Sequence, residues 1–339
     1  MKVLMALSGG VDSSMSAKFL QDAGYEVIGC YMMLHQKSGY HEENIRKVRK
    51  VGEFLGIKTH ILDLQERFKN DVYDLFVRSY AQGITPNPCA HCNRLIKFGA
   101  LWEFALLNGC ERIATGHYAR IDNGLLKSAL DDSKDQSYFL SNIEPAMLGR
   151  IIFPLGDKLK KDIKEAASKI PQIAELATQK ESSEICFVEN TYMEILARHF
   201  DTQTKGIVRN AAGDIIGEHE GYMNYTIGKR KGFRVHGAHE AHFVTAIDAA
   251  NNEITVGLKS ELESMSFETL NFNNFTDKSE FDCLVKIRYR SQPVACSVRP
   301  NERGGVSVRL KSPASAVASG QLACFYDESS HVLASGFIA

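Results

Sequence analysis

The sequence lacks the features of a membrane or secreted protein. It has no apolar run of about 18 residues, the length that a membrane-spanning helix requires. Its start has no basic segment followed by an apolar stretch and a small-residue cleavage site. Its net charge is only −1, so the overall charge does not indicate a nucleic-acid-binding protein. These absences lead us to expect a cytoplasmic protein that does not use a membrane.

Closely spaced cysteines are also scarce. Of the 8 cysteines, Cys89 and Cys92 alone lie near one another, as C-x-x-C, and no second C-x-x-C accompanies them. A reducing compartment argues against eight structural half-cystines, so we expect most of the others to be small buried residues.

What is present fits a soluble protein of several domains. A length of 339 residues suggests two or three domains, and 44% hydrophobic with 24% charged residues is ordinary. The charge is spread unevenly, because residues 281–311 hold seven Lys or Arg and two acids while 261–282 hold six acids and one base. A second basic cluster runs from Lys229 to Arg234. Such clusters either follow a phosphate backbone or form an ordinary solvated surface.

Hydrophobic patterning predicts an α/β domain followed by β-rich ones. We predict strands at 2–7, 25–32, 57–64 and 111–118, and helices at 13–23, 42–55, 66–81 and 94–108. Strands that alternate with helices imply a doubly wound parallel sheet, which binds ligands at the carboxyl ends of its strands. After about residue 200 the long helices disappear.

The second half of the chain is expected to be mostly β. Residues 242–257 read as a hairpin that turns at Asn251-Asn252, and four short strands between 283 and 327 predict a small antiparallel barrel. We therefore divide the chain into an α/β domain at 1–200, a central mostly-β domain at 201–265 and a C-terminal β-barrel at 266–339.

The first strand runs into Ser8-Gly9-Gly10-Val11-Asp12-Ser13 and then a helix. Glycines let the backbone approach a ligand, and the free N–H groups at a helix start favour phosphate. Asp12 is unexpected there, because a carboxylate repels phosphate unless Mg²⁺ lies between them or unless Asp12 caps the helix. The loop has neither G-K-[ST] nor G-x-G-x-x-G. It resembles the S-G-G-x-D-S loop of the N-type ATP pyrophosphatases, which adenylate a carbonyl oxygen.

The C-x-x-C pair lies in a second motif, G-I-T-P-N-P-C-A-H-C-N-R-L-I-K-F at 83–98. Cys89 and Cys92 precede a predicted helix whose first turn carries Arg94 and Lys97, and this setting predicts thiols of lowered pKa that act as nucleophiles. Two alternatives remain open: a zinc site completed by His60, His117 or Cys186, and a thioredoxin-like redox pair. Cys186, in E-I-C-F-V at 184–188, reads on its own as a buried strand cysteine.

The ordered motifs resemble the tRNA-specific 2-thiouridylase family over essentially the whole chain. In addition to the two motifs above and E-I-C-F-V, the resemblance rests on A-T-G-H-Y-A-R at 114–120, K-D-Q-S-Y-F-L at 134–140, F-P-L-G at 153–156, Y-T-I-G-K-R-K-G-F at 225–233, I-R-Y-R at 287–290 and S-G-Q-L-A-C-F-Y-D at 319–327. It departs mildly at Lys229, where relatives usually have glutamine, and at Cys89, where many have aspartate.

The resemblance implies an ATP-dependent sulfur transfer. ATP, with Mg²⁺ near Asp12, adenylates O2 of the wobble uridine of a tRNA, and sulfur arrives as a persulfide on Cys186. Either Cys92 releases sulfide from that persulfide, or the persulfide attacks C2 directly and Cys92 resolves it. Both routes end in a Cys92–Cys186 disulfide. The expected partners are the tRNAs for glutamate, glutamine and lysine and a persulfide-carrying donor protein; no tightly bound metal is expected.

Residue roles carry over from the same resemblance. ATP binding is implied for Ala6, Leu7, Ser8, Gly9, Gly10, Val11, Asp12, Ser13, Met32 and Gly116. Contact with the target base is implied for Asn87, Pro88 and Cys89. Contact with tRNA is implied for His117, Lys134, Asp135, Gln136, Arg288, Tyr289 and Gln321.

Two other functional classes share parts of this pattern. An ATP pyrophosphatase-type ligase or amidotransferase acting on a small carboxylate would use the same loop, but it has no need of widely separated cysteines or a basic barrel. A zinc-dependent RNA-binding protein would use Cys89 and Cys92 as ligands. The histidine-rich stretch 234–242 reads as a solvated loop or an incidental metal binder.

Overall fold

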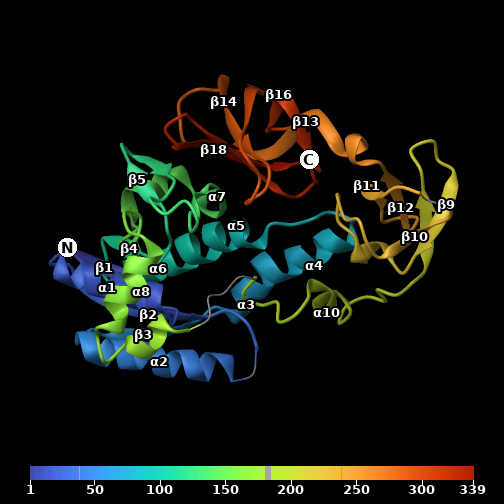
Figure 1. The fold of residues 1–339 in the computed structure, drawn as a ribbon. Helices are drawn as coiled ribbons and strands as arrows, with labels where there is room; N and C mark the ends of the chain where they lie inside the picture. The colour runs from blue at the N-terminus through green and yellow to red at the C-terminus, as the bar shows by residue number, and fades with distance from the viewer. Residues whose placement is uncertain (38, 180–184, 238) are drawn as a thin grey trace.

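The computed structural model describes residues 1–37, 39–179, 185–237 and 239–339. Figure 1 shows three bodies: an N-terminal α/β domain, a central β domain and a C-terminal barrel. Two helical runs, one through α3 and α4 and one through α5 and α6, cross the middle of the molecule between them. Within the described residues, no helix is long and apolar enough to cross a membrane.

The N-terminal sheet is parallel and has the order β3-β2-β1-β4-β7. Its strands are β1 (Lys2–Ala6), β2 (Glu26–Met33), β3 (Thr59–Asp63), β4 (Arg112–Ala114) and β7 (Ile151–Ile152). Along β1, Val3 and Met5 enter one apolar core while Leu4 enters the other, so both faces of the sheet are covered. β2 and β3 lie on one side of β1, and β4 and β7 lie on the other, so the order of the strands reverses at β1. Folds of this kind bind their ligands at the carboxyl ends of the strands at this reversal point. The predicted fold class is confirmed.

The helices flank this sheet. Those of the outer layers are α1 (Val11–Asp22), α2 (Tyr40–Leu55), α8 (Lys160–Ser168) and α9 (Ala174–Ala177). The helix predicted at 66–81 is α3 (Gln65–Phe68), a π-helical turn at Lys69–Tyr73 and α4 (Asp74–Ala81). Smaller elements complete the domain: β5 (Arg120–Asp122), β6 (Leu125–Lys127), α7 (Ser137–Leu140), a 3-10 turn at Pro145–Arg150 and α10 (Tyr192–Leu196).

The helix predicted at 94–108 begins earlier than expected. It starts as α5 (Pro88–Cys92), continues as a π-helix η2 (Asn93–Ala100) and ends as α6 (Leu101–Leu107). Asn87 caps it, because its side-chain oxygen accepts a bond from the Ala90 N–H at 3.2 Å, and Pro88 suits the first helical position. Both cysteines of the C-x-x-C motif therefore lie within the helix rather than before it.

The central domain is one mixed sheet of order β10-β9-β8-β12-β11. Its strands are β8 (Gly206–Arg209), β9 (Ile215–His219), β10 (Phe233–Val235), β11 (Phe243–Asp248) and β12 (Glu253–Gly257). The predicted hairpin is β11–β12, and its turn places Asn252 at φ +52°, a conformation that asparagine tolerates well.

The C-terminal body is a closed antiparallel barrel of order β13-β16-β15-β14-β17-β18. Its strands are β13 (Glu263–Asn274), β14 (Phe281–Lys286), β15 (Val294–Pro300), β16 (Val306–Ser315), β17 (Leu322–Tyr326) and β18 (Val332–Ile338). Sequence reasoning predicted β14 to β17. It missed β13 and β18, which close the barrel by pairing with one another.

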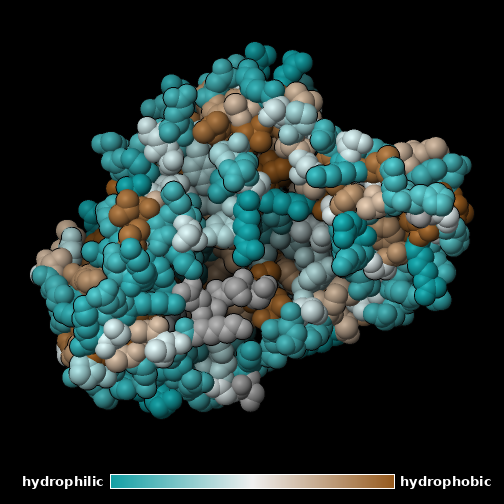
Figure 2. Space-filling view, viewed as in Figure 1, coloured by the Kyte–Doolittle hydropathy of each residue, from teal (hydrophilic) through white to brown (hydrophobic). Residues whose placement is uncertain are grey.

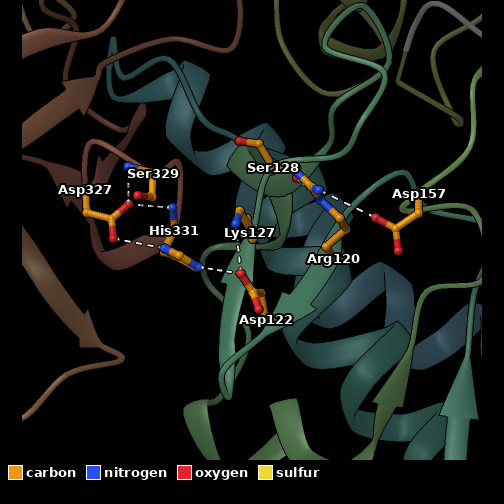
Figure 3. A network of polar contacts seen from close by, with 8 residues as sticks. All are labelled: Arg120, Asp122, Lys127, Ser128, Asp157, Asp327, Ser329 and His331. Carbon is orange, nitrogen blue, oxygen red and sulfur yellow. Dashed lines mark hydrogen bonds and ion pairs between the residues drawn. The ribbon is translucent and has the colours of Figure 1, made fainter.

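A polar junction fastens the barrel to the N-terminal domain (Figure 3). Asp122 on β5 accepts bonds from Lys127 on β6 at 2.8 Å and from His331 at 2.9 Å. The other ring nitrogen of His331 lies 2.9 Å from Asp327, in the turn between β17 and β18. The backbone N–H of Ser128 also donates to the carbonyl of Ser330 at 3.0 Å.

The Asp122→Asn substitution is expected to lower the Tm at neutral pH. Lys127 and His331 hold the pKa of Asp122 at about 2, below its ordinary value. A depressed carboxyl pKa stabilises the folded state above the unfolded pKa, and this stabilisation is lost as the pH falls through the folded pKa. The Tm difference from wild type should therefore shrink between about pH 5 and about pH 2. Equal Tm values at neutral pH would contradict the expectation.

Candidate active site

The loop between β1 and α1 is organised by its own hydroxyl groups. The Ser13 hydroxyl accepts a bond from the Ser8 N–H at 3.1 Å, and the Ser14 hydroxyl donates to the Gly10 carbonyl at 2.9 Å. Gly9 has φ +82°, which favours glycine. Gly10 is the N-cap of α1, and no side chain caps this helix end. Its first N–H groups are thus available to an anion such as phosphate.

Asp12 faces a buried lysine. Its carboxylate accepts a bond from the Tyr118 hydroxyl at 2.8 Å and from Lys160 Nζ at 2.5 Å. Lys160 begins α8 and is only 7% exposed. The alternative that Asp12 caps α1 is wrong, because Gly10 holds that position and Asp12 is engaged elsewhere. Sequence reasoning missed Lys160 and Tyr118, since their proximity to Asp12 depends on packing between distant segments.

Met32 and Gly116 lie where the sheet meets this loop. Met32 is near the carboxyl end of β2, and Gly116 follows β4. A Cβ at Gly116 would lie 2.9 Å from the Ser13 N, so glycine is needed for the β4 loop to approach the start of α1. The ten residues predicted to bind ATP therefore share one edge of the sheet, although their contact with ATP stays a prediction.

The two predicted catalytic cysteines come together from distant segments. Cys92 ends α5 and packs with Phe68, Val72 and Ile96, and the partly buried Phe187 joins the same apolar cluster. Aromatic rings also surround Phe187: its ring centroid lies 5.5 Å from that of Phe68, 5.7 Å from that of Tyr73 and 5.2 Å from that of Phe76. Phe187 therefore anchors its neighbour, the exposed Cys186, beside the Cys92 helix. Residues 180–184, which precede it, lie outside the described residues.

The thiols are not activated as the sequence predicted. Burial raises the pKa of Cys92 to about 12, and it also raises the pKa of Cys89. Cys186 keeps an exposed surface, yet the atoms packed around its thiol desolvate it enough to raise its pKa to about 11. Lys97 lowers all three values, but desolvation outweighs it. The expectation of lowered pKa values for Cys89 and Cys92 is wrong for this state, because both lie within the helix and are partly or fully withdrawn from water.

Both histidines proposed to complete a zinc site are engaged elsewhere. His117 contacts Thr115 at 2.7 Å and Lys97 at 3.2 Å, and the ring of His60 packs on Phe104 at 5.4 Å. Across the described ranges, no three His, Cys, Asp or Glu side chains form a group that could hold a metal ion.

The residues predicted to face the target base differ in exposure. Asn87 and Pro88 are buried, with the Asn87 oxygen used as the helix cap, while Cys89 is half-buried. Their contact with a base stays a prediction.

Several residues predicted to touch tRNA instead hold the domains together in this structure. Arg288 donates to the carbonyls of Ile227 at 3.0 Å and Ala316 at 2.9 Å. Gln321 donates to the carbonyls of Thr85 at 3.0 Å and Pro86 at 3.1 Å, and so ties the barrel to the loop before α5.

Other predicted tRNA contacts shape the turn after β6. The buried carboxylate of Asp135 accepts bonds from the Ala129 N–H at 2.9 Å and the Ser137 hydroxyl at 2.7 Å. Gln136 accepts from the Tyr118 N–H at 3.0 Å. The ring of Tyr289 packs on Phe139 at 4.6 Å. Lys134 lies half-buried in the same turn.

The surface near these elements is concave. Figure 2 shows a hollow between the three bodies, with apolar side chains lying inside it and polar ones around it.

Comparison with known proteins covers the whole chain. Family models match residues 1–190 (tRNA methyl transferase HUP domain), 193–258 (tRNA methyl transferase PRC-barrel domain) and 262–338 (aminomethyltransferase beta-barrel domain). The chain is 68% identical to the tRNA-specific 2-thiouridylase MnmA of Campylobacter fetus subsp. fetus and 59% identical to that of Campylobacter lari, each over 100% of both chains.

Among solved structures, a 4-thiouridine synthetase in an RNA complex with bound ATP matches 58% of this chain and 49% of its own, with 18% identity and a TM-score of 0.36. The full-length identity to the curated relatives is what decides the family. The chain belongs to the tRNA-specific 2-thiouridylases.

Proposed function

We propose that the chain is an ATP-dependent tRNA-uridine 2-sulfurtransferase that acts in the cytoplasm on the wobble uridine of a tRNA. The observation that carries this proposal is the apolar cluster around Cys92: Phe187, the neighbour of Cys186, packs on it, and so does Met32 from the end of β2. The descriptions of two family models name a methyl transferase, but an anion loop and paired thiols are suited to adenylation and sulfur transfer.

The first half-reaction activates the base. The uridine O2 attacks the α-phosphate of ATP, pyrophosphate leaves, and C2 then carries AMP as a leaving group. The free N–H groups at the start of α1 would receive the phosphates, with Lys160 as the nearby cation. The carboxylate of Asp12 is a suitable oxygen ligand for Mg²⁺, which would neutralise charge on the departing pyrophosphate.

The second half-reaction replaces the oxygen by sulfur. In one route the Cys92 thiolate attacks the inner sulfur of a Cys186 persulfide, which releases hydrosulfide to attack C2 as AMP leaves. In the other, the outer persulfide sulfur attacks C2 and AMP leaves, and Cys92 then attacks the Cys186 sulfur to release the 2-thiouridine. Both routes leave a Cys92–Cys186 disulfide, which a thiol reductant must reopen. We propose a persulfide-carrying protein as donor and the tRNAs for glutamate, glutamine and lysine as substrates.

The test is a thiolation assay with the full chain. Wobble-uridine tRNA, Mg-ATP and a sulfide source are incubated with the protein, and the RNA is run on a mercury-containing gel that retards thiolated species. A retarded band that requires ATP supports the proposal. If no band forms with folded protein and abundant sulfide, the proposal fails, and AMP release that ignores tRNA would then favour a ligase for a small carboxylate.

Arg288→Ala is expected to weaken tRNA binding. Arg288 lies in the basic part of the barrel and joins it to the central domain, so its loss removes a cation and loosens the joint between two domains. If the guanidinium also meets a phosphate, the slope of log Kd against log salt should fall by about 1. Titration of labelled tRNA at several salt concentrations measures both quantities. An affinity and slope equal to those of the wild type would remove Arg288 from the interface.

A further inference from the structure

Lys97 lies on the same helical run as Cys92, one π-turn further along. The residues Asn93–Ala100 form a π-helix, in which backbone bonds join residues five apart, so Cys92 and Lys97 share one side of this helix. Gly99 permits that geometry, because a Cβ there would lie 3.1 Å from the Arg94 carbonyl oxygen. In a regular α-helix, residues five apart would point in different directions.

The hydrogen bond to His117 orients the Lys97 ammonium. Burial, and then the charge of Lys97, lower the pKa of His117 well below its usual value, so the ring is neutral at pH 7. A neutral ring with Lys97 Nζ 3.2 Å from its Nε2 must accept there, and its Nδ1–H then donates to Thr115 Oγ1 at 2.7 Å. Thr115 and His117 thus hold the lysine side chain without neutralising it.

The charge of Lys97 lowers the pKa of three thiols, although burial is the larger influence on each of them. The charge acts on Cys89, Cys92 and Cys186, which come from two separate segments of the chain, and His117 is the further titratable group that it influences. Throughout the described ranges, no carboxylate pairs with Lys97. Arg94, the other cation on this helix, is bonded to Glu144 and to the Asn142 carbonyl and is therefore committed elsewhere.

We propose that Lys97 is the positioning residue that holds negative charge on sulfur in this site, serving Cys92 and Cys186 in turn. Its purpose in sulfur transfer rests on the proposed function, but its effect on the thiols does not. Because Cys92 is buried while Cys186 is exposed, the cation acts more strongly on Cys92, and Cys186 remains open to reagents in solution. A single lysine that acts on both cysteines can stabilise the thiolate of one and the persulfide anion of the other at successive stages.

The test measures thiol reactivity in the full chain without ATP or tRNA. Alkylation of Cys186 by iodoacetamide is followed by peptide mass spectrometry as a function of pH, because the thiolate is the reacting form. Lys97→Gln keeps a donor for His117 but removes the charge. It should slow labelling at about pH 8 by about tenfold, equivalent to a rise of one pKa unit, and shift the pH midpoint upward. Lys97→Arg should restore most of the rate.

Two further variants complete the test. Lys169→Met, on an exposed lysine paired with Glu165, should label like the wild type. Lys97→Met repeats the loss of charge if the glutamine variant fails to fold, with Tm as the check. Wild-type rates and pH profiles in both neutral variants would overturn the role of Lys97. Absence of thiolation by the wild-type protein, in contrast, would count against the proposed function and leave the labelling result standing.

Discussion

Cys186→Ala is expected to abolish sulfur transfer to tRNA while tRNA-dependent AMP release continues. The two outcomes separate because, in the proposed mechanism, adenylation uses the loop at Ser8–Ser13 and Cys186 enters only when sulfur attacks the activated carbon. Phe187 anchors the Cys186 segment through the rings of Phe68, Tyr73 and Phe76, none of which belongs to the loop at 8–13. We expect thiolation to fall below detection.

The measurement combines the mercury gel with quantification of AMP from labelled ATP. Cys283→Ala is the matched control, because this half-buried thiol lies on β14 of the barrel and should leave both readouts unchanged. Normal thiolation by the Cys186→Ala protein with a persulfide donor would refute the role of Cys186 as sulfur carrier. If the variant loses both AMP release and thiolation, Cys186 supports the activation step as well.

Lys160→Met should lower the rate of tRNA-dependent AMP release by about 100-fold or more, as expected when a preorganised charge at a reacting phosphate is removed. Lys160 is buried at the amino end of α8 and forms an ion pair with Asp12 in the loop. Arriving phosphates would compete for the ammonium, which frees the carboxylate to accept a metal ion. Methionine fills similar space but supplies no charge, so both the phosphates and Asp12 lose their partner.

The matched control is Lys161→Met. Lys161 follows Lys160 on α8 but is exposed, so its substitution should leave the rate of AMP release unchanged. Binding of Mg-ATP by calorimetry separates affinity from rate, and Tm reports any loss of stability. An AMP release rate within about threefold of the wild type would contradict the role of Lys160, because a lost phosphate contact in a transition state costs more than that.

The α/β domain was largely predictable because its signals are local. Buried strands such as β1 and β2 read as short apolar runs, and the helices between them show apolar spacing and end at glycines such as Gly24 and Gly56. The start of α5 was misplaced by six residues, although Asn87-Pro88 is an N-cap followed by a proline at the first helical position. That signal is present in the sequence, upstream of the start predicted at Arg94.

The barrel was predicted less completely because its closure depends on long-range pairing. β13 carries Glu263 and Glu268 and has register shifts against both neighbours, so its pattern is not a clean alternation. Its apolar positions become a core face only when β16 and β18 lie beside it. A strand of this kind is specified by its partners more than by its own composition.

The family could be identified from the sequence, and the loop at 8–13 and the two cysteines could be selected as candidates, because each belongs to a contiguous motif. Three features are visible only in the folded chain: the pairing of Asp12 with Lys160, the approach of the Cys186 segment to the Cys92 helix, and the raised pKa values of both thiols. These features arise from contacts between residues tens to more than a hundred positions apart and from the burial that packing imposes, and neither can be read from a linear pattern.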